Sequence, residues 1–103
     1  MKFETTPAFE GDWRRLSNEN QKIFRKVVLE KFAPACDVYA DNPATAWPKS
    51  LRVESISGTK GVMAMTWSFA SPDGRATFEF VSVNNELRLR WRRIGNHAIY
   101  REP

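Results

Sequence analysis

The chain is poor in cysteine, and this limits how it can be held together. Cys36 is the single cysteine among 103 residues, so no disulfide can form within the chain. A small domain without such cross-links is typical of a reducing compartment, and we expect a cytoplasmic protein. No basic residue adjoins Cys36 in the sequence, so we expect an inert, partly buried thiol.

Long apolar runs, internal repeats and low-complexity stretches are also absent. Nowhere do eighteen apolar residues follow one another, and the first thirteen residues mix charged, polar and apolar side chains. Neither a secretion signal nor a membrane span is expected, so we predict a soluble protein without a membrane partner. The length is typical of one domain, and residues 1–103 are interpreted as such.

Acidic residues are missing from one part of the C-terminal half. Residues 1–48 carry seven Lys or Arg and seven Asp or Glu, whereas residues 49–103 carry nine and five. Five arginines follow one another there with no acid between them: Arg88, Arg90, Arg92, Arg93 and Arg101. Such a field attracts polyanions, and nucleic acid is a common one in cytoplasm.

The N-terminal third begins with a period of two. Residues 2–9 alternate between two kinds of side chain, which predicts a half-buried strand. Pro7 lacks a backbone donor, so this strand is expected to fray there or to lie at a sheet edge.

A helical period follows. Between positions 12 and 32 the apolar residues fall three, four and seven apart, which predicts an amphipathic helix. Ser17 is the expected N-cap, and Asp12 is expected to cap a short preceding turn. Pro34 should kink or stop the helix, and the sequence leaves open whether residues 35–40 form a second one.

From position 51 onward the period is two again. The strands are expected over 51–56, 62–69, 75–80 and 87–92, with turns at 57–61, 71–74 and 84–85 and an end at 94–95. This order predicts an α+β fold, in which an N-terminal strand and one or more helices precede a four-stranded antiparallel meander. The helices should pack on one face of the sheet and leave the arginines on the other.

Alternation also predicts which side chains share a face in the last strand. Arg88, Arg90 and Arg92 should lie together, and Arg93 should point the other way unless the strand bulges. The alternative to a binding role for these arginines is a solvated strand face. Three tryptophans are expected in or beside the core, namely Trp47, Trp67 and Trp91, although Trp91 lies beside the arginines and could stack on a base.

Several segments together resemble the RelE/ParE toxin superfamily. They are LSNENQKIFRKVV near the N-terminus, then LRVESISGTKGVMAM, GRATFEF and LRLRWRRIGNHAIYREP. The resemblance implies the RelE fold and a toxin that is normally held by a small antitoxin protein. In the RelE branch it implies ribosome-dependent cleavage of mRNA, with contacts to rRNA. A ParE-like inhibitor of DNA gyrase and a non-catalytic antitoxin-binding module are the alternatives.

Metal-free cleavage of RNA requires a base that activates the 2′-hydroxyl, cations that hold the phosphate, and an acid for the leaving oxygen. No metal and no small-molecule cofactor are therefore expected. By resemblance, Arg75 matches a phosphate-binding arginine, His97 occupies the place of a catalytic group, and Tyr100 ends the motif as a stacking or proton-transferring residue. The alternatives are a surface ion pair for Arg75, an incidental histidine, and an aromatic residue at the core edge.

Five further basic residues are candidate RNA-binding residues: Arg52, Lys60, Arg88, Arg90 and Arg92. Glu54 could serve as a base only if it shared the arginine face. Alternation from position 51 puts Arg52 and Glu54 on one face, where an exposed cross-strand pair is the alternative interpretation.

Overall fold

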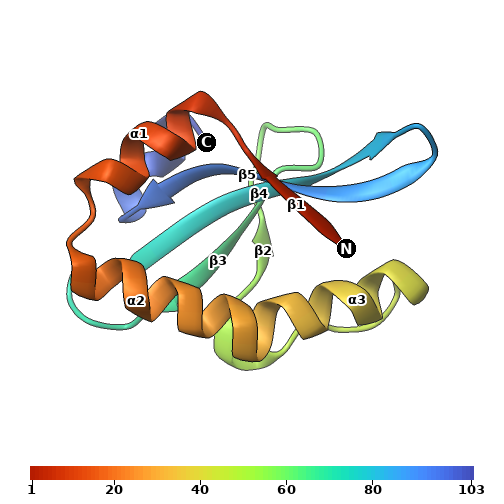
Figure 1. The fold of residues 1–103 in the computed structure, drawn as a ribbon, viewed down its shortest axis with the longest axis horizontal. Helices are drawn as coiled ribbons and strands as arrows, with labels where there is room; N and C mark the ends of the chain where they lie inside the picture. Colours follow the sequence, from red (N-terminus) through yellow and green to blue (C-terminus); the bar gives the residue numbers. More distant parts are fainter.

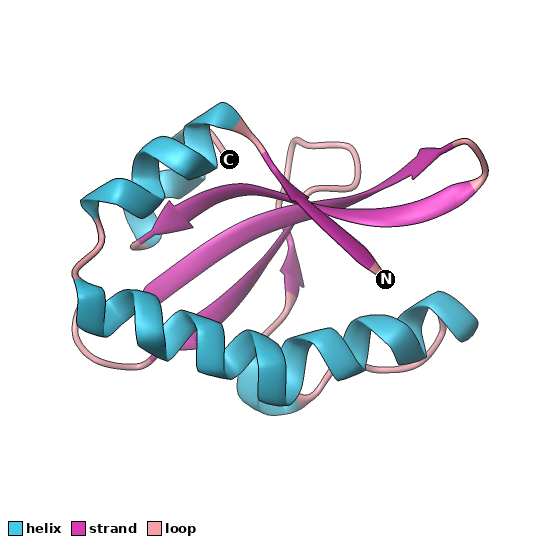
Figure 2. Ribbon diagram, viewed as in Figure 1, coloured by secondary structure: helices cyan, strands magenta, loops and turns pink.

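The computed structural model describes residues 1–103 as a sheet with helices on one side (Figures 1 and 2). The helical segments are α1 (Pro7–Arg15), α2 (Asn18–Val27), the π-helical turn η1 (Val28–Phe32), α3 (Ala33–Asp41) and two 3-10 turns, η2 (Lys49–Leu51) and η3 (His97–Arg101). The strands are β1 (Lys2–Thr5), β2 (Glu54–Ser55), β3 (Met63–Ser68), β4 (Gly74–Val83) and β5 (Glu86–Gly95). No helix is both long enough and apolar enough to cross a bilayer.

The first strand is shorter than predicted, because a helix begins inside the segment 2–9. Thr6 caps α1 by accepting a hydrogen bond from the Phe9 amide at 3.1 Å. Pro7 takes the first helical position, where its missing N–H has no partner to lose. The prediction of a strand over 2–9 is therefore wrong beyond Thr5. Asp12 lies within α1 instead of capping a turn.

The second helix begins as predicted and runs further than predicted. The Ser17 hydroxyl accepts a hydrogen bond from the Asn20 amide at 3.1 Å, which confirms Ser17 as N-cap. Pro34 does not stop the helix, because η1 widens the turn just before it and helical backbone continues as α3 to Asp41. Residues 35–40 are therefore helical.

The sheet has the order β1-β5-β4-β3-β2. Strands β2 to β5 form the predicted antiparallel meander, whereas β1 pairs with β5 in parallel. The strand predicted at 51–56 is reduced to Glu54–Ser55, because η2 occupies its start and Arg52 adopts a left-handed conformation with φ 45°. Asn84 and Asn85 have φ of 53° and 63°, so the hairpin turn predicted there is confirmed.

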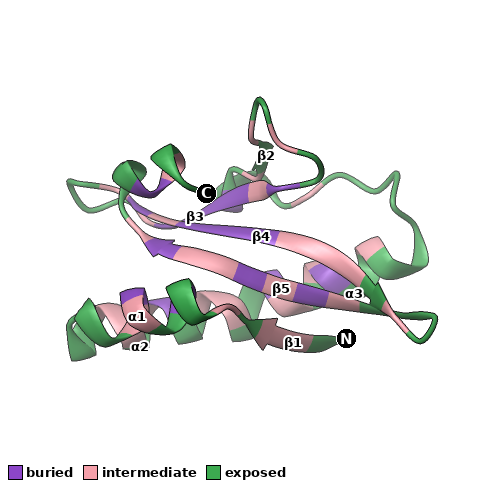
Figure 3. Cartoon of the chain, turned by 90° about the horizontal axis from the view of Figure 1, so that it is seen from above, coloured by how far each residue is buried: buried purple, intermediate pink, exposed green.

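The core lies between the helices and one face of the sheet (Figure 3). Trp91 is at its centre, with ring centroids 5.2 Å from Phe24, 4.8 Å from Phe32 and 5.7 Å from Phe78. Burial of Trp91 confirms its place in the core and removes it from any RNA-binding surface. Buried Cys36 packs in the same cluster, and burial raises the pKa of its thiol to about 12, in agreement with an inert side chain.

A β-bulge decides where the last arginines point. Phe78 pairs with Trp91 and Thr77 pairs with Arg93, so Arg92 is an extra residue in β5. Arg93 therefore shares the face of Thr77, and its guanidinium reaches Asp12 of α1. We predicted that Arg93 would point away from the other arginines unless the strand bulged. The strand does bulge, and Arg93 lies on their face.

Candidate functional site

A cluster of polar side chains lies on the face of the sheet that the helices leave open. The η3 turn and the C-terminal residues lie on this face, over β4 and β5 (Figure 3). Arg75 Nη1 donates a hydrogen bond to the Tyr100 hydroxyl at 3.1 Å, and this hydroxyl donates to Glu54 Oε1 at 3.1 Å. The same carboxylate oxygen is 3.6 Å from Arg75 Nη1. Arginine, phenol and carboxylate thus form one connected group.

Each member is positioned by a different element. Arg75 is near the start of β4, where Thr66 of β3 and Gly95 of β5 are its cross-strand partners. Tyr100 is carried by η3, whose N-terminus is capped by Asn96: Oδ1 of Asn96 accepts a hydrogen bond from the Ala98 amide at 2.8 Å. Buried Ile99 holds the turn to the sheet, because its side chain packs closely on Gly95 of β5. A Cβ added to Gly95 would lie only 3.0 Å from the Ile99 side chain.

The Arg75 guanidinium is held by its neighbours and is only 17% exposed. Asp73 Oδ2 accepts a hydrogen bond from Nη2 at 3.4 Å, while buried Nε has no partner. Burial raises the pKa of the Tyr100 phenol, and its hydrogen bond to Glu54 adds to this against the opposing effect of Arg75. The phenol is therefore protonated at neutral pH. No group of three or more His, Cys, Asp or Glu side chains is placed to hold a metal ion.

His97 lies at the border of this cluster. Its ring centroid is 4.5 Å from that of Tyr100, and the side chain is exposed to solvent. The structure therefore brings together the three residues predicted as catalytic, Arg75, His97 and Tyr100, and places Glu54 with them. The condition set for Glu54, that it share the arginine face, is met.

Arg52 and Lys60 have other surroundings than alternation predicts. Arg52 precedes β2 rather than belonging to it, and its guanidinium lies 5.0 Å from the centre of the Phe69 ring. Alternation predicted that Arg52 and Glu54 share a strand face. This prediction is wrong, because only Glu54 belongs to the strand. Lys60 lies exposed in the turn between β2 and β3. Neither residue has a carboxylate within ion-pair distance.

Arg88, Arg90 and Arg92 share a face, as predicted, and the bulge adds Arg93 to it, but these arginines do not lack acids. Their shortest ion pairs are Arg88 with Glu86 at 3.1 Å, Arg90 with Glu4 at 3.1 Å, Arg92 with Glu79 at 2.7 Å and Arg93 with Asp12 at 2.7 Å. Three of these acids come from β1, α1 and β4, which explains why the local sequence suggested unbalanced charge. The expectation of a basic field without balancing acids is therefore wrong for these four arginines.

Part of the β5 arginine row also lies far from the polar cluster around Arg75. Arg88 pairs with Val81, which is six residues along β4 from Arg75, or roughly 20 Å at the usual strand rise. An RNA that contacted both residues would have to follow the length of the strand. Arg92 is nearer, but its Nε donates to the main-chain oxygen of Pro103 at 3.0 Å.

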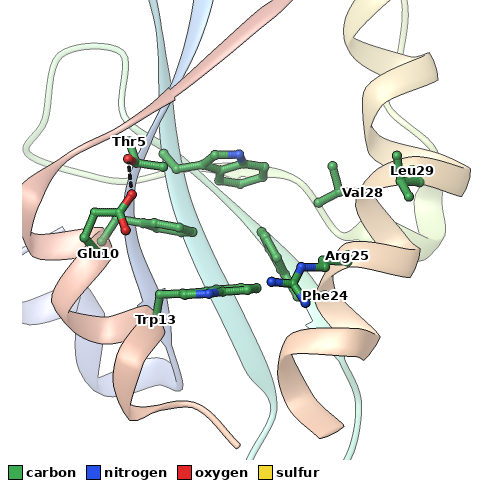
Figure 4. A pocket seen from close by; sticks show the side chains of 9 residues that line it. Thr5, Glu10, Trp13, Phe24, Arg25, Val28 and Leu29 are labelled. Carbon is green, nitrogen blue, oxygen red and sulfur yellow. Dashed lines mark hydrogen bonds between the residues drawn. The ribbon is translucent and has the colours of Figure 1, made fainter. Parts of the chain in front are cut away.

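A second concave feature lies on the helix side and was not predicted. It is an apolar groove of about 460 Å³ between α1 and α2, shown in Figure 4. The lining residues are Thr5, Phe9, Glu10, Trp13, Phe24, Arg25, Val28, Leu29 and Trp91. Arg25 lies 5.1 Å from the centre of the Trp13 ring, and Leu29 is 74% exposed. An exposed leucine next to a basic residue on the predicted helix is a signal that could have indicated this groove.

Comparison with known proteins gives a fold and no close relative. No protein-family model matches the chain, and no curated protein does. A solved structure described as a YoeB/ParE toxin from Agrobacterium tumefaciens is similar, with a TM-score of 0.59 and 15% sequence identity. The match covers 94% of this chain and 99% of that one. The fold implied by the resemblance is thus confirmed, and the chain has the fold of a RelE/ParE-type toxin.

Proposed function

We propose that this chain is the toxin of a type II toxin-antitoxin pair and that it cleaves mRNA on the ribosome. The observation that carries the proposal is the connected group of Arg75, Tyr100 and Glu54 with His97 beside it. This cluster holds a cation for the phosphate, a carboxylate and an imidazole for proton transfer, and a phenol between them, which are groups that can cleave RNA without a metal.

In the proposed reaction the Glu54 carboxylate accepts the proton of a 2′-hydroxyl. The freed oxygen attacks the adjacent phosphorus, and the bond to the 5′-oxygen breaks to leave a 2′,3′-cyclic phosphate. Arg75 stabilises the charge that develops on the phosphate, which its planar fork suits. His97 supplies the proton that the leaving 5′-oxygen takes up, and Tyr100 keeps Glu54 and Arg75 in register.

The resting ion pairs are part of this proposal. Glu54 and Asp73 now occupy the positions around Arg75 where phosphate oxygens would lie. Both carboxylates are considerably more exposed than the guanidinium, so Asp73 can turn toward solvent when a phosphate arrives, and Glu54 can move aside while it keeps its hydrogen bond from Tyr100. RNA binding is then an exchange of one anion for another at a fixed arginine.

The test is cleavage of mRNA on purified ribosomes, with cut sites mapped by primer extension. His97→Ala and Glu54→Gln should each reduce the rate at least roughly a hundredfold, because one acid or base group contributes about 10² to 10⁴. Arg101→Ala is the matched control, since Arg101 is exposed on the same turn and has no ion pair. Equal rates for the three variants and the unaltered chain would reject the mechanism.

Inhibition of DNA gyrase is the second candidate, because the similar solved structure carries the name ParE as well as YoeB. A gyrase inhibitor would stop supercoiling of plasmid DNA and leave RNA whole. If the chain stops supercoiling and His97→Ala stops it equally well, the polar cluster has no catalytic role. A chain that affects neither RNA nor gyrase, but binds the antitoxin, would be the non-catalytic module.

We propose further that the antitoxin seats a segment in the groove between α1 and α2. The groove is apolar at its base, and two charged residues line it: Arg25, which has no carboxylate partner, and Glu10, which accepts a hydrogen bond from Thr5 (Figure 4). Two further lysines, Lys22 and Lys26, are exposed on the same helix as Arg25 and make its surface basic. This favours a segment with a large apolar side chain flanked by Asp or Glu. Leu29→Asp with Arg25→Glu should abolish co-purification with the antitoxin, whereas Leu87→Asp at the far hairpin should not.

A further inference from the structure

Phe69 is an aromatic side chain that the core does not use. Alternation from Met63 groups Phe69 with Met65 and Trp67 on the core face, but the register of β3 shifts between Thr66 and Ser68. Met65 and Trp67 are buried, whereas Phe69 is 54% exposed. The bulge thus turns a phenyl ring out into solvent.

Arg52 is the neighbour of this ring. Its guanidinium lies 5.0 Å from the ring centre, within cation–π range. The residue has φ 45° and ψ 48°, a left-handed conformation that non-glycine residues rarely adopt. No carboxylate pairs with it, in contrast to Arg75 and the arginines of β5. Phe69 and Arg52 therefore present an exposed aromatic ring and an uncompensated charge side by side.

This pair lies next to the polar cluster. Arg52 comes two residues before Glu54, and Phe69 comes directly after β3, whose Thr66 pairs with Arg75. Strand β2 is two strands away from β4 in the sheet, which is roughly 10 Å at the usual strand spacing. If an RNA binds Arg75 through one phosphate, a base next to that phosphate can span this distance and reach Phe69 and Arg52.

We infer that Phe69 and Arg52 form a stacking platform for the nucleobase adjacent to the phosphate bound at Arg75. The inference rests on the proposed function and adds to it a determinant of which RNA sequence is bound. Every base has a π face that can stack on phenyl or guanidinium, and purines offer the larger one. The platform is therefore expected to favour a purine at one position beside the phosphate.

A stacking probe tests the platform without requiring cleavage. Short oligoribonucleotides carrying 2-aminopurine at successive positions are titrated with the full chain. The fluorescence at one position should be quenched, because 2-aminopurine loses emission when it stacks. Phe69→Ala should remove the quenching and raise Kd about tenfold, within the range for loss of one stacked base.

Three further variants separate stacking from other contacts. Phe69→Trp should keep the quenching, Phe69→Leu should lose it although it preserves apolar volume, and Arg52→Ala should weaken it. Leu87→Ala, which removes an exposed apolar side chain at the far hairpin, is the control and should leave Kd unchanged. Because Phe69 is exposed, these variants should melt within a few degrees of the unaltered chain.

The two proposals fail in different ways. Quenching that is absent from the unaltered chain, or that survives in Phe69→Leu, would overturn the platform. Quenching with the expected variant pattern, in a chain that cuts no ribosome-bound mRNA, would support the platform and reject the nuclease. If the chain does cut, Phe69→Ala should also flatten the base preference beside the cut site.

Discussion

The hydroxyl of Tyr100 donates a hydrogen bond to Oε1 of Glu54 at 3.1 Å, although 46 positions separate the two residues in the chain. The same hydroxyl accepts from Arg75, so one phenol connects a cation and an anion that come from β4 and β2. This bridge ties the C-terminal turn to the edge of the sheet. It is also the contact on which the proposed chemistry most directly depends.

Tyr100→Phe removes this bridge and keeps the ring. We expect ribosome-bound mRNA to be cut at least tenfold more slowly, because Glu54 and Arg75 lose the group that sets their spacing. The free energy of unfolding should fall by only about 1 kcal/mol, the usual contribution of a hydrogen bond. Cleavage and urea unfolding measured on the same samples check this. A variant that cuts at the normal rate would show that the bridge is structural only.

Asp12 connects α1 to the end of β5. Its carboxylate accepts from Arg93 Nε at 2.7 Å, from the Ile94 amide at 3.1 Å and from Arg15 at 2.6 Å. Asp12→Ala should lower the free energy of unfolding by about 3 kcal/mol, since it leaves a partly buried arginine without its carboxylate and the Ile94 amide without its acceptor. Urea unfolding at neutral pH measures the loss. The variant Arg14→Ala, on an exposed position of the same helix, is the control, because Arg14 has no ion pair.

The contribution of Asp12 should also depend on pH. Burial alone would raise the pKa of this carboxyl, but hydrogen bonds from Arg93 and Ile94 outweigh burial and hold the pKa below its ordinary value of 3.8. A carboxyl whose pKa is lower in the folded state than in the unfolded state stabilises the fold at pH values above its ordinary pKa. This stabilisation is lost as the pH falls through the pKa of the folded state. The stability gap between the unaltered chain and Asp12→Asn should therefore shrink below about pH 4. A gap that is constant down to pH 2 would contradict this.

Cys36 should not react with thiol reagents while the chain is folded. The side chain is fully buried, and burial raises the pKa of its thiol to about 12 with a further contribution from Asp37. At pH 8 roughly one thiol in 10⁴ is then ionised, and the thiolate is the reactive form. A disulfide reagent should label the chain in denaturant and not in buffer. Rapid labelling in buffer would show that the packing around α3 opens.

The turn between β4 and β5 requires residues that tolerate positive φ. Asn85 has φ 63°, so Asn85→Ala should lower the free energy of unfolding by about 1 kcal/mol. Asn85→Gly is the matched variant and should retain or slightly raise stability, because Asn-Gly suits this kind of turn. Thermal melts of the two variants give the comparison. Equal melting temperatures for both would show that the turn relaxes when Asn85 is changed.

Local patterns in the chain were enough for most of the fold. The alternation after position 62 identified β3, β4 and β5, and Ser17 marked the start of α2, because strand period and helix capping depend on near neighbours. The same reasoning failed at Pro7 and Pro34. Proline excludes a backbone donor but does not decide between the start of a helix, a widened turn and a break, which depends on what packs around it.

The sequence by itself determined that the arginine side chains of one strand would point away from the core. It also identified Arg75, His97 and Tyr100 as residues to test. Only the tertiary structure decided which charges remain available. Glu4, Asp12 and Glu79 lie far from the β5 arginines in sequence and pair with them in space. Two bulges, which shift a strand by one residue, moved Arg93 onto the arginine face and turned Phe69 out of the core. The physical reason is that side-chain direction in a strand has a period of two, so a single extra residue reverses every assignment beyond it.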